Sequence, residues 1–237
     1  MKFSYLMYDP VPELPELARR MRRVAELGYQ GIELSATHPL GYSLEEAAAL
    51  ARELKLPIVS LLSGWSYAHE GLCLSSPTES VRIRAVKRLI EYIGFAKALG
   101  SIVVVGLMQG LRSDEADPDV ANVRIAECLR QVARAAEAQG VQLVIEPVNH
   151  LQVGFNHTAA EALALVQRVN SPALGYMLDT INMNIEERSL LETIKVHASR
   201  IGHFHLCETN GGLFGSGSLD FKRVLAALGD AGYDRYV

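Results

Sequence analysis

Three apolar segments in the second half of the chain each end in a side chain that binds divalent metals. The segments are Leu143–Glu146, Tyr176–Asp179 and Ile201–His205, and the last residues stand 33 and then 26 positions apart. Each interval is long enough for a helix with two loops. The segments are therefore predicted to be parallel strands whose carboxyl ends meet at one edge of a sheet, with the three ligands directed at one point.

Glu146, Asp179 and His205 offer two hard carboxylate ligands and one imidazole. That donor set suits Mn²⁺, Co²⁺, Mg²⁺ or Zn²⁺ and does not select among them. A single acidic residue at a strand end is equally typical of a helix N-cap or an ion pair, but three ligands on successive strands favour a metal centre. His203 is expected to lie on the opposite face of its strand from His205, packed between strand and helix.

Side chains at other strand ends are candidates for substrate binding. Glu33 ends an early strand and is expected to bind or orient a substrate or ligand, or else to form a structural ion pair. Amides suit the hydroxyls of a sugar, although Asn and Gln are also ordinary loop residues. The further candidates follow the predicted strands and are Trp65, His69, Gln109, Asn149, Gln152 and Asn182.

The rest of the chain alternates regularly between strand-like and helical patterns. Strands are expected at 2–6, 31–34, 57–62, 102–105, 142–146, 174–179, 201–205 and 233–237. Helices are expected at 14–24, 44–54, 80–99, 120–138, 159–169, 187–199 and 221–228. Eight strand starts, with no G-x-G-x-x-G after the first, predict a single (β/α)₈ TIM-barrel domain over residues 1–237. The eighth strand only begins around Tyr236, so its remainder is expected to follow Val237.

The composition bounds the partners of this protein. The chain of 237 residues is 49% hydrophobic and 21% charged, with a formal charge of −4 that comes from interspersed acidic and basic residues. No basic face or apolar run of membrane length is visible, so neither a nucleic acid nor a membrane is expected as a partner. Three scattered cysteines without a C-x-x-C pair indicate a reducing, cytoplasmic environment.

The ligand-bearing segments resemble those of a known family. Leu143–Asn149, Met177–Glu187 and Gly202–Asn210 are similar to motifs of the xylose-isomerase-like TIM barrels. The similarity is closest to the sugar isomerase and epimerase branch that contains the ketose 3-epimerases, which act on tagatose and psicose. It extends over essentially the whole chain.

The resemblance implies an enzyme that uses a divalent metal, most often Mn²⁺ or Co²⁺. Glu146, Asp179 and His205 match three metal ligands, and a second glutamate is expected after Val237. The two glutamates are implied to exchange a proton with the substrate from opposite faces, which makes Glu146 a catalytic residue. The implied reaction is isomerisation or epimerisation of a small sugar or sugar derivative through a metal-stabilised enediolate. A homodimer or homotetramer is expected from the same resemblance.

Three positions differ from the epimerase pattern. The epimerases have a glutamate at Gln152, a histidine at Asn182 and an arginine at Gly211. All three positions are neutral here, which indicates a different sugar, a sugar acid or an oxidised sugar derivative as the substrate.

Other classes of function are open on the sequence alone. The same barrel and metal could serve a lyase or dehydratase acting on a sugar-derived or oxo-acid substrate. A DNA-repair endonuclease of a related barrel family would need more zinc-binding histidines and a basic surface. A metal-free binding barrel is the non-enzymatic alternative.

Overall fold

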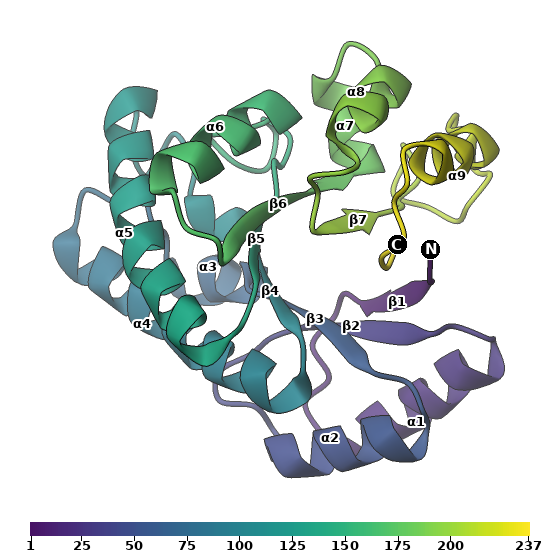
Figure 1. The fold of residues 1–237 in the computed structure, drawn as a ribbon. Helices are drawn as coiled ribbons and strands as arrows, with labels where there is room; N and C mark the ends of the chain where they lie inside the picture. The colour runs from purple at the N-terminus through teal and green to yellow at the C-terminus, as the bar shows by residue number, and fades with distance from the viewer.

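The computed structural model describes residues 1–237 and places one parallel sheet at the centre of the molecule, with the helices on its outer face (Figure 1). The seven strands are hydrogen-bonded in chain order. They are Ser4–Met7 (β1), Gly31–Ser35 (β2), Ile58–Leu62 (β3), Ile102–Val105 (β4), Leu143–Ile145 (β5), Leu174–Asp179 (β6) and His203–His205 (β7). Every pair of neighbours is parallel, which confirms the predicted barrel class.

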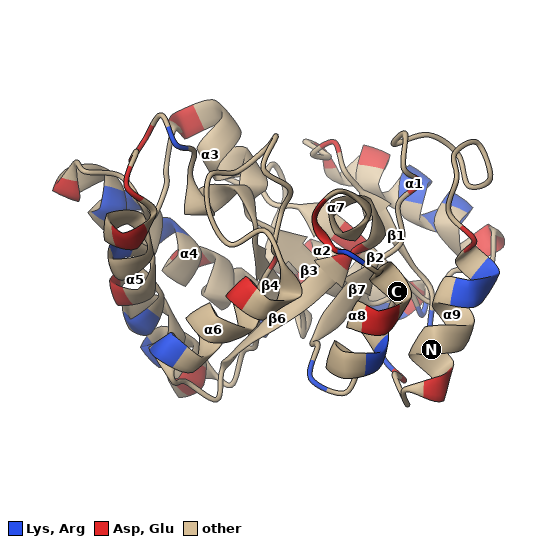
Figure 2. Cartoon of the chain, turned by 90° about the horizontal axis from the view of Figure 1, so that it is seen from above, with Lys and Arg blue, Asp and Glu red and all other residues tan.

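The helices connect successive strands along the outside of the sheet. Their bounds are Leu14–Glu26 (α1), Leu44–Glu53 (α2), Gly64–Glu70 (α3), Glu79–Leu99 (α4), Pro118–Gln139 (α5), Ala159–Val169 (α6), Thr180–Glu186 (α7), Leu190–His197 (α8) and Phe221–Asp230 (α9), with a short 3₁₀ turn at Leu107–Gln109. Acidic and basic residues are interspersed on these helices (Figure 2). None of the helices combines the length and apolar character that a bilayer-spanning segment needs.

The last residues of the chain lie beside the first strand. Tyr236 forms an isolated parallel bridge with Lys2, and the backbone N–H of Val237 donates to the carbonyl of Lys2 at 2.8 Å. The expected strand at 233–237 is therefore limited to this one bridge on the β1 side. The guanidinium of Arg235 donates to the carbonyl of Ile201, just before β7, at 3.4 Å.

The structure corrects the sequence prediction around residues 180–199. One helix was expected at 187–199, but two short helices, α7 and α8, occupy this stretch. Glu187 adopts an extended conformation that ends α7, and the Ser189 hydroxyl caps α8 by accepting the N–H of Glu192. Helix α3 was not expected, because Gly64–Glu70 contains no apolar stripe at helical spacing.

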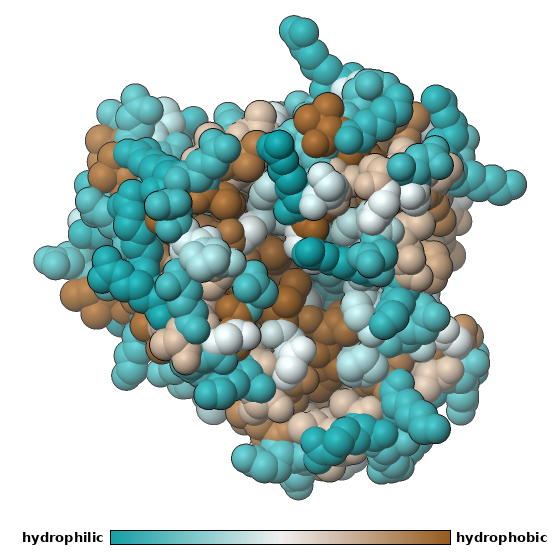
Figure 3. Space-filling view, viewed as in Figure 1, coloured by the Kyte–Doolittle hydropathy of each residue, from teal (hydrophilic) through white to brown (hydrophobic).

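Apolar side chains pack on both faces of the sheet. The large core lies between the sheet and the helices, whereas Val104, Val144 and Met177 form a separate small cluster. Met177 shares its face of β6 with Asp179, because residues two apart on a strand point the same way. Hydrophobic residues are also visible in the hollow at the centre of the face shown in Figure 3, within a hydrophilic rim. The small cluster thus forms an apolar layer on the same face as the candidate ligands.

Candidate metal centre

The three predicted metal ligands lie together at the carboxyl ends of neighbouring strands. Glu146 directly follows β5, and Asp179 and His205 are the last residues of β6 and β7. One ligand atom from each lies within 4.8 Å of the other two. Two ligands each about 2.2 Å from one ion are at most about 4.4 Å apart, so a small side-chain adjustment fits this donor set to a single divalent ion.

Asp179 contributes to both local structure and the ligand cluster. Its Oδ1 accepts the N–H of Ile181 at 3.0 Å and caps the N-terminus of α7. Its Oδ2 lies 3.7 Å from Nδ1 of His205. The N-cap interpretation of this residue and the ligand interpretation are therefore compatible, because each uses a different oxygen.

The Glu146 carboxylate is confined on both sides. Its Oε1 accepts a hydrogen bond from Nδ2 of Asn182 at 3.1 Å. A Cβ added at Gly106 would lie only 2.8 Å from its Oε2, so a residue without a side chain leaves the room that this oxygen occupies. Burial raises the pKa of Glu146 to about 7, with an opposing contribution from His205 and a further rise from Asp179.

Three of the predicted substrate-binding amides are buried and support Glu146 instead of lying open to solvent. The backbone N–H and the side-chain Nδ2 of Asn149 donate to Oδ1 of Asn182, at 3.1 and 2.6 Å. Since a backbone N–H is always a donor, it fixes Asn182 with its oxygen toward Asn149 and its NH₂ toward Glu146. Gln109 donates from Nε2 to the Glu146 carbonyl at 2.9 Å, and its Oε1 accepts from Asn156.

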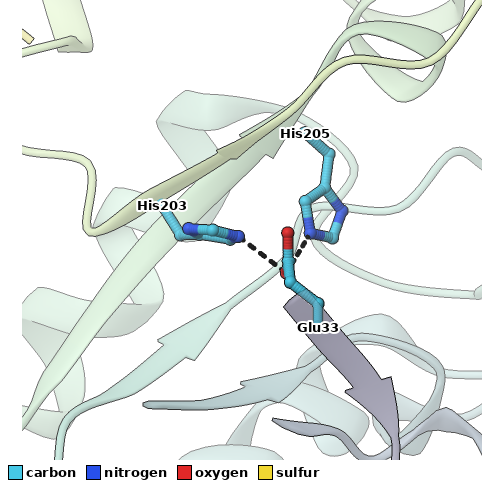
Figure 4. Close-up of side chains that lie close together, drawn as sticks. All are labelled: Glu33, His203 and His205. Atoms are coloured by element: carbon cyan, nitrogen blue, oxygen red, sulfur yellow. Dashed lines mark hydrogen bonds and ion pairs between the residues drawn. The ribbon is translucent and has the colours of Figure 1, made fainter. Parts of the chain in front are cut away.

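Glu33 is the centre of a second buried cluster (Figure 4). The Nε2 atoms of His203 and His205 lie 2.7 and 3.0 Å from its Oε2. The Ser60 hydroxyl donates to the same oxygen at 2.5 Å, and the Ser4 hydroxyl donates to Oε1 at 2.8 Å. A register shift between β2 and β3 places Ser60 opposite Glu33. Because both carboxylate oxygens already accept protein donors and the residue is only 2% exposed, Glu33 contacts His203 and the candidate ligand His205 and not solvent.

The position of His203 corrects the sequence prediction. Its ring lies on the same face of β7 as that of His205, with centroids 5.1 Å apart, and both rings reach Glu33. Residues two apart on a strand share a face, so the prediction of opposite faces was wrong. The His-x-His spacing at the strand end was a signal that could have placed His203 beside His205. No comparable signal marked Ser4 or Ser60, whose roles depend on strand register.

The charges of this cluster are coupled. Burial by itself raises the pKa of Glu33, but His203 and His205 more than reverse that effect, so its pKa lies well below the usual range. Burial lowers the pKa of His205, yet Glu33 and Asp179 outweigh it and hold that pKa well above the usual range. Without a metal, the centre therefore pairs an ionised Glu33 with a protonated His205.

The other predicted substrate-binding residues lie on α3 and in the loop after β5. Trp65 and His69, on α3, stack with their ring planes 4° apart and centroids 4.1 Å apart. The indole N–H of Trp65 donates to the carbonyl of Tyr8 at 3.3 Å. Gln152 is exposed in the loop after β5. None of these three side chains hydrogen-bonds to Glu146, Asp179 or His205.

Comparison with known proteins identifies the family. A family model described as xylose isomerase-like TIM barrel matches residues 21–237. The L-ribulose 3-epimerase of Mesorhizobium japonicum is 31% identical over 221 residues, which cover 92% of this chain and 73% of that protein. The ketose 3-epimerase of Arthrobacter globiformis is 28% identical over 217 residues, covering 90% of this chain and 73% of the relative.

The three-dimensional comparison agrees with the sequence comparison. A solved structure of L-ribulose 3-epimerase superposes with a TM-score of 0.89 at 29% identity, covering 99% of this chain and 79% of that one. The resemblance predicted from the strand-end motifs is thereby confirmed. The chain belongs to the xylose isomerase-like TIM barrel family, in the branch that contains the ketose 3-epimerases.

Proposed function

We propose that this protein is a divalent-metal-dependent isomerase or epimerase of a small sugar or sugar derivative. The observation that carries the proposal is the convergence of Glu146, Asp179 and His205 at the carboxyl ends of β5, β6 and β7, in a chain whose relatives are sugar 3-epimerases. We assign these three residues as metal ligands, with Mn²⁺ as the preferred ion and Co²⁺, Mg²⁺ or Zn²⁺ as alternatives. The family comparison favours this reaction over a lyase or dehydratase.

Glu146 is assigned as a catalytic base. A bound divalent ion supplies positive charge that stabilises the negative charge developing on a substrate carbonyl oxygen. Asn182 engages Oε1 of Glu146, which leaves Oε2 to accept a proton from the carbon next to that carbonyl. A carboxylate placed beside that carbon can accept the proton as a general base. Protonation of the same carbon by a second acid on the opposite face gives an epimer, and return of the proton by Glu146 to the neighbouring carbon gives an isomer.

The remaining predicted residues are assigned two roles: some contact the substrate, and others position the residues of the centre. The stacked Trp65 and His69 offer a flat wall, and Gln152 offers an exposed amide in the loop after β5. Asn182 and Gln109 hydrogen-bond to Glu146, and Asn149 fixes Asn182, so these three amides position the catalytic carboxylate. Glu33 positions His205 in the same way. The neutral residues Gln152, Asn182 and Gly211 extend the proposed substrates beyond ordinary ketohexoses to sugar acids and oxidised sugars.

The same reasoning extends to the partner, the oligomeric state and the location of the enzyme. The partner is a small carbohydrate, and we propose a homo-oligomer, dimer or tetramer, which light scattering at known concentration measures directly. All three cysteines are free, which supports a reducing, cytoplasmic location.

The test combines metal content with solvent-proton exchange. Metal-free protein is reloaded with Mn²⁺ and incubated in D₂O with ketoses, sugar acids and oxo sugars, and deuterium incorporation at carbon is followed by NMR and mass spectrometry. We expect an isomeric product of unchanged composition carrying deuterium, whereas loss of water would indicate a dehydratase. Glu146→Gln and Asp179→Asn should lose metal, while Glu192→Gln on the exposed side of α8 should not. Unchanged metal content in both ligand variants would refute the assignment.

A further inference from the structure

Glu33, His203 and His205 form a second buried cluster, which connects the candidate metal centre to strand β2. Glu33 belongs to β2, whereas His203 and His205 belong to β7, and these strands are not neighbours. The contacts therefore cross the barrel interior between residues that stand 170 and 172 positions apart in the chain. All three side chains are buried.

The hydrogen-bond directions determine which nitrogen of His205 is available to an ion. An ionised carboxylate only accepts, so Nε2 of His205 must carry the hydrogen that faces Oε2 of Glu33, at 3.0 Å. Nδ1 is the other ring nitrogen, and it faces Oδ2 of Asp179 at 3.7 Å. Nδ1 thus lies on the side of Asp179 and Glu146, where the three candidate ligands converge.

We propose that Glu33 is a positioning residue that holds His205 by its Nε2–H and so presents Nδ1 to the metal. The donors Ser4, Ser60 and His203 fix the carboxylate of Glu33 in turn, so loss of any one of them leaves two. A carboxylate behind a ligating imidazole sets the tautomer and ring orientation, and its removal typically weakens metal binding about 10–100-fold. This inference rests on the metal centre of the proposed function.

Metal binding to the metal-free protein tests the inference without reference to catalysis. Isothermal titration with Mn²⁺ measures affinity and stoichiometry, and the visible spectrum of the Co²⁺ form reports the ligand field. We expect one ion per chain in the wild type and in Glu33→Gln, with a dissociation constant about 10–100-fold higher and an altered Co²⁺ spectrum in the variant. His203→Phe removes only one of the donors that fix Glu33, so its dissociation constant should stay within about threefold of wild type.

Each outcome has a separate meaning. A folded Glu33→Gln protein with wild-type affinity and spectrum would overturn the inference, while metal binding by the wild type would leave the proposed function intact. No binding by the wild type would refute the metal centre itself. Two ions in the wild type and one in Glu33→Gln would also overturn the positioning inference, because Glu33, His203 and His205 would then be a second metal site. If Glu33→Gln does not fold, the double variant Ser4→Ala, Ser60→Ala replaces it, with a loss of affinity on the order of tenfold expected and an unchanged affinity contradicting the inference.

Discussion

Replacing Glu146 by glutamine should change how the stability of the metal-free protein depends on pH. The folded protein holds the pKa of this carboxyl at about 7, against 4.5 for the ordinary group, chiefly because the side chain is buried. Between these two values the folded state keeps a proton that the unfolded chain has lost. The Glu146 contribution to the free energy of unfolding therefore falls as pH rises from about 4.5 to beyond 7.

The magnitude follows from the size of the pKa change. At about 1.4 kcal/mol for each tenfold change in proton affinity, a rise from 4.5 to about 7 corresponds to about 3 kcal/mol. Glu146 retains partial solvent contact, which screens the effect, so about 2–3 kcal/mol is expected. Glu146→Gln keeps the shape and the acceptor for Asn182 but cannot ionise. The wild type should consequently lose about 2–3 kcal/mol relative to this variant between pH 4.5 and pH 8.

Urea denaturation in the presence of a chelator, at half-unit pH intervals, measures this difference. Glu192→Gln, on an exposed part of α8, serves as the control and should give a difference nearly independent of pH. Added Mn²⁺ at pH 8 should stabilise the wild type more than Glu146→Gln, because binding to the folded state raises its stability. A wild-type minus variant difference that is constant with pH, or that grows as pH rises, would refute the reasoning about burial of this carboxyl.

Three further predictions concern the same centre. Gly106→Ala places a methyl group 2.8 Å from Oε2 of Glu146 and should weaken Mn²⁺ binding about tenfold by titration calorimetry, whereas Gly175→Ala, whose nearest neighbours are at 3.9 Å, should not. Mn²⁺ affinity should fall at least about tenfold per pH unit below pH 7, because protons on Glu146 and His205 compete with the ion; proton release measured in two buffers checks this. Asn182→Asp puts a like charge beside Glu146, raises its pKa and should shift the acid limb of the activity–pH profile to higher pH, while an unmoved limb would exclude Glu146 as the base.

The alternation of strands and helices was predictable because its signals are local. Apolar periodicity located β2, β4 and β6 to within one residue, and Gly100 and Gly140 end α4 and α5 at left-handed φ values of 70° and 69°, as expected for glycine after a helix. Helices α3 and α7 were not predicted. Both are seven-residue segments with mixed polar sequences, and such short helices depend on tertiary contacts more than on propensity.

The candidate site also contains some features that the sequence predicted and others that it did not. Glu146, Asp179 and His205 were accessible to sequence reasoning because each ends its own strand, and parallel strands bring their carboxyl ends to one edge. The roles of the amides were not accessible. Asn182 and Asn149 were expected to face a substrate, but in the structure Asn149 donates to Asn182 and Asn182 donates to Glu146, contacts that depend on how α7 packs beside β6.

The sequence by itself determined the barrel class and the convergence of Glu146, Asp179 and His205 at one edge of the sheet, because both follow from local periodicity and strand direction. Only the tertiary structure showed that Glu33 reaches across the interior to His203 and His205. That contact joins residues 170 and 172 positions apart and depends on the curvature of the sheet, while the register shift between β2 and β3 places Ser60 beside the same carboxylate. Curvature and register arise from the packing of the whole barrel, so no short stretch of sequence specifies them.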